Sequence, residues 1–290
     1  MKYVIPYNYS GRDLQSLLRK ELGISKRMLR ILKLNKGILL NGKSVPPKNI
    51  SVKEGDLLEL KLDKCETRDL TEPQDIPINV IYEDKYMIVV DKDPHIVVHP
   101  TYNYPNGTLA NGISYYAKSK GEKYPIRYVN RLDRGTSGLI IIGKNRYYCY
   151  QLQKAPMDKN YIALVWGELS SKEGVMDMPI RRKEDSFIER EVGDGGKRAI
   201  TKYKVLEYLG DMTLLELDLI TGRTHQIRVH LKTLGHPVVG DTIYGPDTDL
   251  ISRPALHSYK LHFYHPLKKE FLKFTAPIHK DMKDLISKVK

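Results

Sequence analysis

One carboxylate between two guanidinium groups is the first feature of this sequence that could do chemistry. Asp133 stands between Arg131 and Arg134, and a glycine-rich turn (135–138) and an apolar run (139–142) follow it. Neighbouring positive charges favour the ionised carboxylate, which is the form that a nucleophile requires. Catalytic groups often lie on loops that a rigid scaffold holds. The pattern predicts a reactive carboxylate just before a buried strand, and a merely charged turn is the alternative.

Three histidines in the C-terminal half raise the question of a metal site. His225, His230 and His236 are five and six residues apart, so the first two do not share a helical face as an H-x-x-x-H pair does. No cysteine or acidic ligand cluster joins them. We therefore expect no metal here.

The composition indicates a basic globular protein. The chain has 290 residues, of which 41% are hydrophobic, and a net charge of +13. This excess favours a polyanionic partner, nucleic acid or an anionic membrane surface, although a basic surface can also serve solubility alone. No run approaches the roughly 20 apolar residues of a membrane helix. The first residues lack the long apolar run of a signal peptide, and Cys65 and Cys149 form no C-x-x-C motif. We expect a cytoplasmic protein without disulfides.

The positive charge is concentrated in residues 1–64, which hold 14 Lys and Arg against 6 Asp and Glu. Apolar spacing predicts a helix over 13–22 and a second helix over 26–35, with Ser25 as its N-cap. A hairpin with an Asn41-Gly42 turn and an alternating strand follow. The order of these elements resembles the S4-like RNA-binding module.

One face of the predicted second helix is strongly basic. It carries four positive side chains, namely Lys26, Arg27, Arg30 and Lys33. Most charge runs are solvated helix surfaces, but this run falls in the most basic part of a basic protein. Because phosphate contacts come chiefly from Lys and Arg, we expect this face to bind phosphates.

The remainder of the chain is predicted to form one larger domain. Residues 65–77 are polar, contain two prolines and are expected to be an interdomain linker. Residues 78–290 alternate strand-like and helix-like segments, including a hairpin around Gly210-Asp211 and a helix over 224–235. This order predicts an α+β domain with a large mixed, mostly antiparallel sheet.

Six ordered segments resemble the pseudouridine synthases of the large ribosomal RNA and tRNA group (RluA/RluD type). The central one resembles H-R-L-D-x-x-T-S/T-G-L, and another matches T-G-R-x-H-Q-I-R-x-H almost throughout. The segments are NRLDRGTSGL (130–139), VDKDPHIVVHPT (90–101), GTLANGI (107–113), KNYIALVWGEL (159–169), TGRTHQIRVHLKTLGHPVVGDTIYG (221–245) and LHSYKLHFYHP (256–266). With the S4-like module, the resemblance covers most of the chain.

The resemblance implies an RNA pseudouridine synthase, an isomerase that turns over the base of a uridine within RNA without a cofactor or metal. Asp133 would act on the ribose, either by covalent attack or by proton removal. Tyr161 would face the detached uracil, and Arg223 would pair with Asp133. Arg131 would fill the stack that the flipped uridine leaves or hold the flipped backbone, and a mere pairing with nearby acids is the alternative. The implied partner is RNA, with ribosomal RNA favoured and tRNA possible, and the simplest assembly is a monomer.

The sequence leaves the roles of several residues open. Asn130 stands where the family commonly has histidine, and Asp93 and His95 disturb the usual K-P-x-G turn. Gln226 and Arg228 either contact RNA or support the helix. Two other functions compete: a catalytically idle RNA-binding protein, and a glycosidase-like hydrolase of a small nucleoside. Glycosidases generally need two carboxylates, and only Asp133 stands in a convincing motif.

Overall fold

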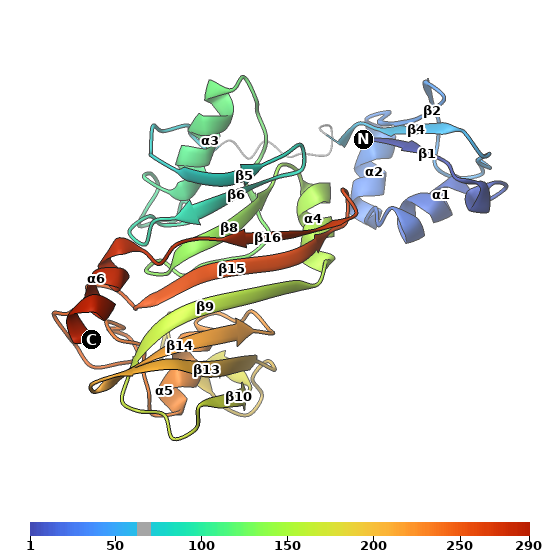
Figure 1. Cartoon of the computed structure of the whole chain (residues 1–290). Helices are drawn as coiled ribbons and strands as arrows, with labels where there is room; N and C mark the ends of the chain where they lie inside the picture. The colour runs from blue at the N-terminus through green and yellow to red at the C-terminus, as the bar shows by residue number, and fades with distance from the viewer. Residues whose placement is uncertain (63–70) are drawn as a thin grey trace.

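A computed structural model describes residues 1–62 and 71–290. They form a small N-terminal domain and a larger domain built on a ten-stranded sheet (Figure 1). Among the helices in these two ranges, none has the length and apolar character to cross a bilayer.

The N-terminal domain packs its helices on a four-stranded sheet of order β1-β4-β2-β3. Its capping and turn residues behave as the sequence predicts. The Ser25 side chain accepts a hydrogen bond from the Met28 amide at 3.1 Å, and Asn41 and Gly42 take positive φ angles of 50° and 78°. The elements are β1 (Lys2–Val4), η1 (Tyr7–Tyr9), α1 (Leu14–Ser16), η2 (Leu17–Glu21), α2 (Lys26–Leu34), β2 (Ile38–Leu40), β3 (Lys43–Ser44) and β4 (Leu57–Leu60).

Two features of this domain differ from the expectation. The helix predicted over 13–22 is one α-helical turn continued by a π-helical turn, in which the Leu22 amide bonds to the Leu17 carbonyl. The strand β1 was not predicted. It is short, and it is fixed by pairing with β4, far along the chain.

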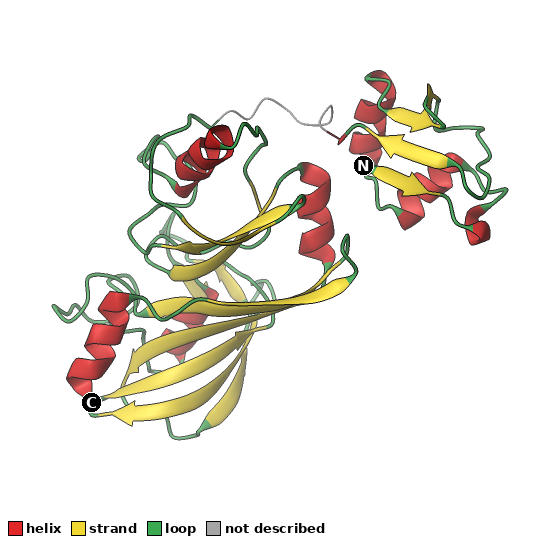
Figure 2. Ribbon diagram, turned by 45° about the horizontal axis from the view of Figure 1, so that its top comes forward, coloured by secondary structure: helices red, strands yellow, loops and turns green. Residues whose placement is uncertain are grey.

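The larger domain confirms the predicted α+β class with a mixed, mostly antiparallel sheet. Its strands follow the order β10-β13-β14-β9-β15-β8-β6-β5, while β16 pairs with β15 and β7 with β8. Figure 2 shows the strands of this domain in yellow and its helices in red. Only β8 and β15 pair in parallel among the described strands. The strands are β5 (Asn79–Glu83), β6 (Met87–Lys92), β7 (Arg127–Tyr128), β8 (Ser137–Gly143), β9 (Met157–Trp166), β10 (Glu173–Asp177), β11 (Ile180–Arg182), β12 (Arg190–Val192), β13 (Ile200–Leu209), β14 (Met212–Leu219), β15 (Leu256–His265) and β16 (Glu270–Thr275).

Helices cover both faces of the sheet around β8. Ile140 and Ile142 pack with Ile113 of α3, and Leu139 and Ile141 belong to a second cluster that includes Leu152 of α4. Every residue of β8 is buried, as the apolar run predicted. The helices of this domain are α3 (Leu109–Ser119), α4 (Arg146–Lys154), α5 (Gln226–Thr233) and α6 (Lys280–Val289).

The helix α4 also carries the contact with the N-terminal domain. Tyr147 and Tyr148 belong to the N-terminal hydrophobic cluster, and the Gln151 side chain donates to the Leu22 carbonyl at 2.9 Å. Figure 1 shows α4 on the side of the sheet that faces this domain.

The predicted linker is described only in part, because residues 65–70 lie outside the described ranges. The described end, 71–77, is bound to α3: the Asn111 side chain donates to the Glu72 carbonyl at 2.8 Å, and Ser114 donates to the Thr71 carbonyl at 2.8 Å. These bonds attach 71–77 to the larger domain, and the boundaries 1–64 and 78–290 stay predictions.

The parallel contact between β8 and β15 depends on Gly138. Its φ is +104°, and a Cβ atom there would overlap the carbonyl oxygen of Ser258 in β15. We predict that Gly138→Ala lowers the free energy of unfolding by more than about 3 kcal/mol, because the backbone must move in addition to being strained. Denaturant unfolding measures this loss.

The matched control is Gly210→Ala, at a hairpin turn. Gly210 also has a positive φ, +61°, but no atom lies within 4 Å of the place that a Cβ would take. Only the left-handed backbone is then strained, at a cost of about 1–2 kcal/mol. Equal losses in the two variants would contradict the close approach at Gly138.

Candidate active site

A cleft of about 1200 Å³ opens beside β7 and β9. Its lining is strongly basic, and Asp133 is the one acidic residue in it. The positive residues are Arg127, Arg131, Lys159, Arg181, Arg182, Arg190, Lys197 and Arg223. Such a cleft attracts a polyanion and directs it onto a single carboxylate.

Asp133 lies on the loop that joins β7 to β8, as the sequence predicts. Before the loop, the chain runs antiparallel to β8, and the Val129 amide bonds to the Ile141 carbonyl at 2.8 Å. The Asn130 side chain extends this pairing: its oxygen accepts from the Ile141 amide at 2.7 Å and its nitrogen donates to the Leu139 carbonyl at 3.1 Å. Asn130 therefore anchors the loop, because an amide offers both a donor and an acceptor.

Two buried basic side chains, Lys92 and Arg253, hold the other side of the loop. Lys92 donates to the Arg134 carbonyl at 3.3 Å, and Arg253 donates to the Gly135 carbonyl at 3.1 Å. Burial lowers the pKa of Lys92 to about 7. Arg253 is held in turn by Asp281 of α6, with two bonds of 2.7 Å. The loop that carries Asp133 is thus fixed from both sides.

The turn at Asp93 and His95 is also ordered. The Asp93 side chain accepts from the His95 amide at 2.9 Å, and its backbone carbonyl accepts from Lys92 at 2.8 Å. An Asx-type bond closes this turn in place of the usual family sequence.

The cation that pairs with Asp133 is Arg228. Its Nη1 lies 3.5 Å from Oδ2 of Asp133, while its other nitrogens bind both oxygens of Asp241 at 2.5 and 2.6 Å. Asp241 is fully buried. Burial works against the charged form of Arg228, but the bonds to Asp241 outweigh it and raise the pKa of Arg228.

The structure does not show the expected pairing of Arg223 with Asp133. Arg223 is exposed, and its Nε donates to the Arg198 carbonyl at 3.0 Å. No ion pair joins Arg223 to Asp133 within the described ranges, although both line the cleft. The physical reason is that α5 begins at Gln226. Arg223 precedes the helix, whereas Arg228 lies on its buried side.

The start of α5 explains the neighbouring polar residues. Gln226 is buried and accepts from the Thr221 hydroxyl at 2.8 Å and the Arg223 amide at 2.9 Å. His225 has a φ of 57° and lies with its Nδ1 2.8 Å from the Tyr244 hydroxyl and its Nε2 4.0 Å from Asp133. Burial lowers the pKa of His225. Gln226 and Arg228 therefore support α5 through hydrogen bonds with neighbouring residues of the protein.

The three histidines of the sequence analysis have separate partners. His230 contacts the Thr201 hydroxyl at 3.0 Å, and His236 contacts the Trp166 carbonyl at 2.9 Å. In the ranges that the structure describes, no three His, Cys, Asp or Glu residues gather as metal ligands.

Tyr161 lies on β9 beside Asp133 and is 4% exposed. Both residues line the cleft, and both also line a smaller pocket together with Thr136 and Arg228. Burial raises the pKa of Tyr161 to about 12. A hydrogen bond with Ser258 lowers this pKa, but its effect is smaller than that of burial. The phenol is therefore neutral at physiological pH and can donate a proton in a hydrogen bond.

The predicted RNA contacts lie on exposed surfaces. Arg131 is exposed at the mouth of the cleft, where its Nη2 donates to Thr224 at 3.0 Å. The four basic residues of α2 are also exposed, and none has an ion-pair partner among the described residues; they are Lys26, Arg27, Arg30 and Lys33.

Comparison with known proteins decides the family. Residues 86–233 match the family model of RNA pseudouridylate synthase, and residues 1–58 match that of the RluD ribosomal pseudouridine synthase N-terminal domain. The chain belongs to the RNA pseudouridine synthase family. It is an isomerase that acts on uridine in RNA.

Individual members of the family match over most of their length. "Uncharacterized RNA pseudouridine synthase YjbO" of Bacillus subtilis is 41% identical over 92% of this chain and 95% of its own. "Ribosomal large subunit pseudouridine synthase D" of Xanthomonas campestris is 33% identical over 98% and 91%. The solved structure "Human RNA Pseudouridylate Synthase Domain Containing 1" has 27% identity and a TM-score of 0.56, covering 73% of this chain and 86% of its own.

Sequence reasoning missed three residues that shape this pseudouridine synthase site: Arg228, Lys92 and Arg253. Arg228 lies in a quoted motif, but its role was left open. Lys92 and Arg253 contact the Asp133 loop from 42 and 118 residues away in sequence, so local pattern carries no signal for them.

The two arginines of the T-G-R-x-H-Q-I-R motif should differ in their effect on stability. We predict that Arg228→Gln lowers the free energy of unfolding by about 3–5 kcal/mol, because Asp241 would remain buried without its cation. Arg223→Gln should change it by less than about 0.5 kcal/mol, as exposed positions usually do. Denaturant titration measures both, and similar losses would refute the buried pair.

Proposed function

We propose that this pseudouridine synthase modifies uridine in the RNA of the large ribosomal subunit. The proposal is supported by the N-terminal match over residues 1–58 and by the relative named for the large ribosomal subunit. Transfer RNA is the less favoured substrate. A ribosomal substrate fits a cytoplasmic protein, and a monomer is the simplest assembly.

We propose that the cleft receives a uridine flipped out of the RNA, next to Asp133 and Tyr161 in its lining. Flipping costs a few kcal/mol in lost stacking, so a side chain must stabilise the gap. Arg131 lies at the mouth of the cleft, and a guanidinium can both stack on bases and bind phosphate. We assign this task to Arg131.

Asp133 is the proposed catalytic residue, and its lone position among cations carries the proposal. With the uridine in the cleft, the carboxylate acts on the ribose while the bond to the ring nitrogen breaks. Both routes, attack on the sugar and removal of a sugar proton, remain open. The base then rejoins through ring carbon 5, which loses its hydrogen as a proton.

Tyr161 is proposed to pack against the detached uracil, with its neutral hydroxyl close to that ring. Arg228 takes the orienting role expected earlier of Arg223, because it contacts the carboxylate. Arg223, exposed in the cleft, is then free to bind an RNA phosphate.

The two competing functions fit the site less well. A nucleoside hydrolase of the glycosidase type needs a second carboxylate, and the residues lining the cleft supply none besides Asp133. An idle binding protein has no physical need for a buried cation held 3.5 Å from a partly exposed carboxylate.

The test of this function is release of tritium from RNA labelled at ring carbon 5 of uridine. RNA from cells that lack the gene is incubated with the wild type or with Asp133→Asn. We expect release by the wild type alone, because the new carbon–carbon bond must displace the label. Filter binding should show RNA affinity within a few fold in the variant.

Fractionation of the labelled RNA tests the substrate. Release confined to large-subunit RNA would agree with the proposal, and release confined to tRNA would overturn it. Full activity of Asp133→Asn would end the assignment of that residue.

The basic face of α2 should contribute to binding through phosphates. We predict that Arg27→Glu with Arg30→Glu weakens RNA binding and reduces the slope of log affinity against log salt by about 0.7–0.9 for each phosphate that the variant no longer binds. The measurement is a salt titration of RNA affinity.

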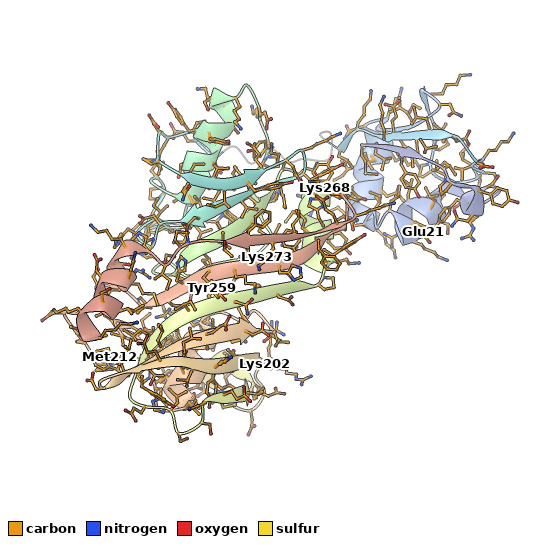
Figure 3. The ribbon with its side chains drawn as sticks, viewed as in Figure 1. Glu21, Lys202, Met212, Tyr259, Lys268 and Lys273 are labelled. Carbon is orange, nitrogen blue, oxygen red and sulfur yellow. The ribbon has the colours of Figure 1, made fainter. Side chains whose placement is uncertain are left out.

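The control reverses two charges on the sheet face opposite the cleft, Lys202→Glu with Lys273→Glu. Both residues are labelled in Figure 3, on β13 and β16. The strand register places Lys202 on the same face of the sheet as Asn160. Tyr161, the next residue, points to the opposite face, on which the cleft lies. The control has the same net charge, so equal loss in both variants would show a general charge effect and no contact by α2.

A further inference from the structure

An exposed aromatic ring projects from the hairpin at the mouth of the cleft. The strands β11 and β12 form this hairpin, and Phe187 lies in the connection between them with 88% of its surface exposed. The next residue, Ile188, is 62% exposed. The strands themselves contribute Arg181, Arg182 and Arg190 to the lining of the cleft. The ring therefore lies on an element that borders the site of Asp133.

The connection that carries Phe187 is tightly hydrogen-bonded. The Ser186 hydroxyl accepts from the amides of Ile188 and Glu189 at 3.2 and 2.9 Å. The Arg182 Nε donates to the Ser186 carbonyl at 2.7 Å. The backbone at Phe187 is thus held in a closed turn, so little backbone entropy remains to be lost when a ligand covers the ring.

The charges around the ring favour an anionic ligand. The Arg182 guanidinium lies 4.5 Å from the centroid of the Phe187 ring. Neither Arg182 nor Arg190 has an acidic partner among the described residues, whereas Arg181 and Lys183 pair with Glu191 and Glu189. An aromatic ring beside a guanidinium group that has no acidic partner is an arrangement that can stack on a base and bind a neighbouring phosphate.

We infer that Phe187 stacks on an unpaired base of the RNA next to the flipped uridine, while Arg182 and Arg190 bind the adjoining backbone. This inference rests on the RNA function proposed above and adds a specific contact to it. Every base has a flat face, so the contact selects RNA that is unpaired beside the target and does not read its sequence.

The experiment compares Phe187→Ala with Phe187→Trp. Alanine removes the ring and should weaken binding to protein-free large-subunit RNA about 5- to 10-fold, within the range for loss of one stacked base. Tryptophan keeps a flat ring and should restore the affinity. Its fluorescence should be quenched by this RNA and by single-stranded oligoadenylate, and much less by a fully paired RNA duplex.

The matched control is Phe271→Trp. Phe271 is 69% exposed, and it shares the face of β16 with Lys273 and Thr275. Thr275 pairs with Lys260 and Lys260 with Asn160, so this face is opposite Tyr161 and the cleft. The RNA should not quench a tryptophan at this position. The wild type, whose single tryptophan is Trp166, reports any change common to all three proteins.

The outcomes separate this inference from the proposed function. If the wild type binds the RNA and releases tritium, but Phe187→Ala binds equally well and Phe187→Trp is not quenched, the stacking contact is refuted and the function stands. If the wild type neither binds nor releases tritium, the proposed function fails. Emission from Phe187→Trp that shifts with protein concentration, without RNA, would assign the ring to contact between copies and overturn the inference.

Discussion

The buried pair between Arg228 and Asp241 is the interaction on which the geometry of the site depends. Asp241 is fully buried and also accepts from the amides of Ile243 and Tyr244. It therefore closes a turn and fixes the guanidinium at the same time. The third nitrogen of Arg228 remains directed at Asp133. Because a buried cation without a partner is costly, the fold cannot move Arg228 away from this position cheaply.

Hydrogen bonds from three other side chains fix the loop that carries Asp133. Asn130 binds β8 through its side-chain amide, and Lys92 and Arg253 bind the carbonyls of Arg134 and Gly135. These are side chains from distant segments acting on backbone groups, so the loop is rigid although it is partly exposed. A carboxylate fixed in this way loses little freedom when a substrate binds, and orientation of this kind lowers the barrier of a reaction.

Local features could be predicted from the sequence, and contacts between distant segments could not. The Ser25 cap, the Asn41-Gly42 turn and the burial of β8 depend on neighbouring residues, and all three are present. Which arginine pairs with Asp133 depends on where α5 begins and how it packs, which a motif of eight residues does not reveal. Near the start of β9, Asp158, Lys159 and Asn160 are polar and look unlike a strand. Pairing with β15 holds them there.

The most direct test of the central claim compares two charge-conserving variants, Arg228→Lys and Arg223→Lys, in single-turnover pseudouridine formation with parallel binding measurements. Lysine retains the charge beside Asp241 but cannot bind two oxygens and still reach Asp133 as the planar guanidinium does. We predict that Arg228→Lys lowers the rate of the chemical step about 100-fold with RNA affinity little changed, and that Arg223→Lys affects mainly affinity. A loss of rate in Arg223→Lys, with Arg228→Lys as fast as the wild type, would contradict the account.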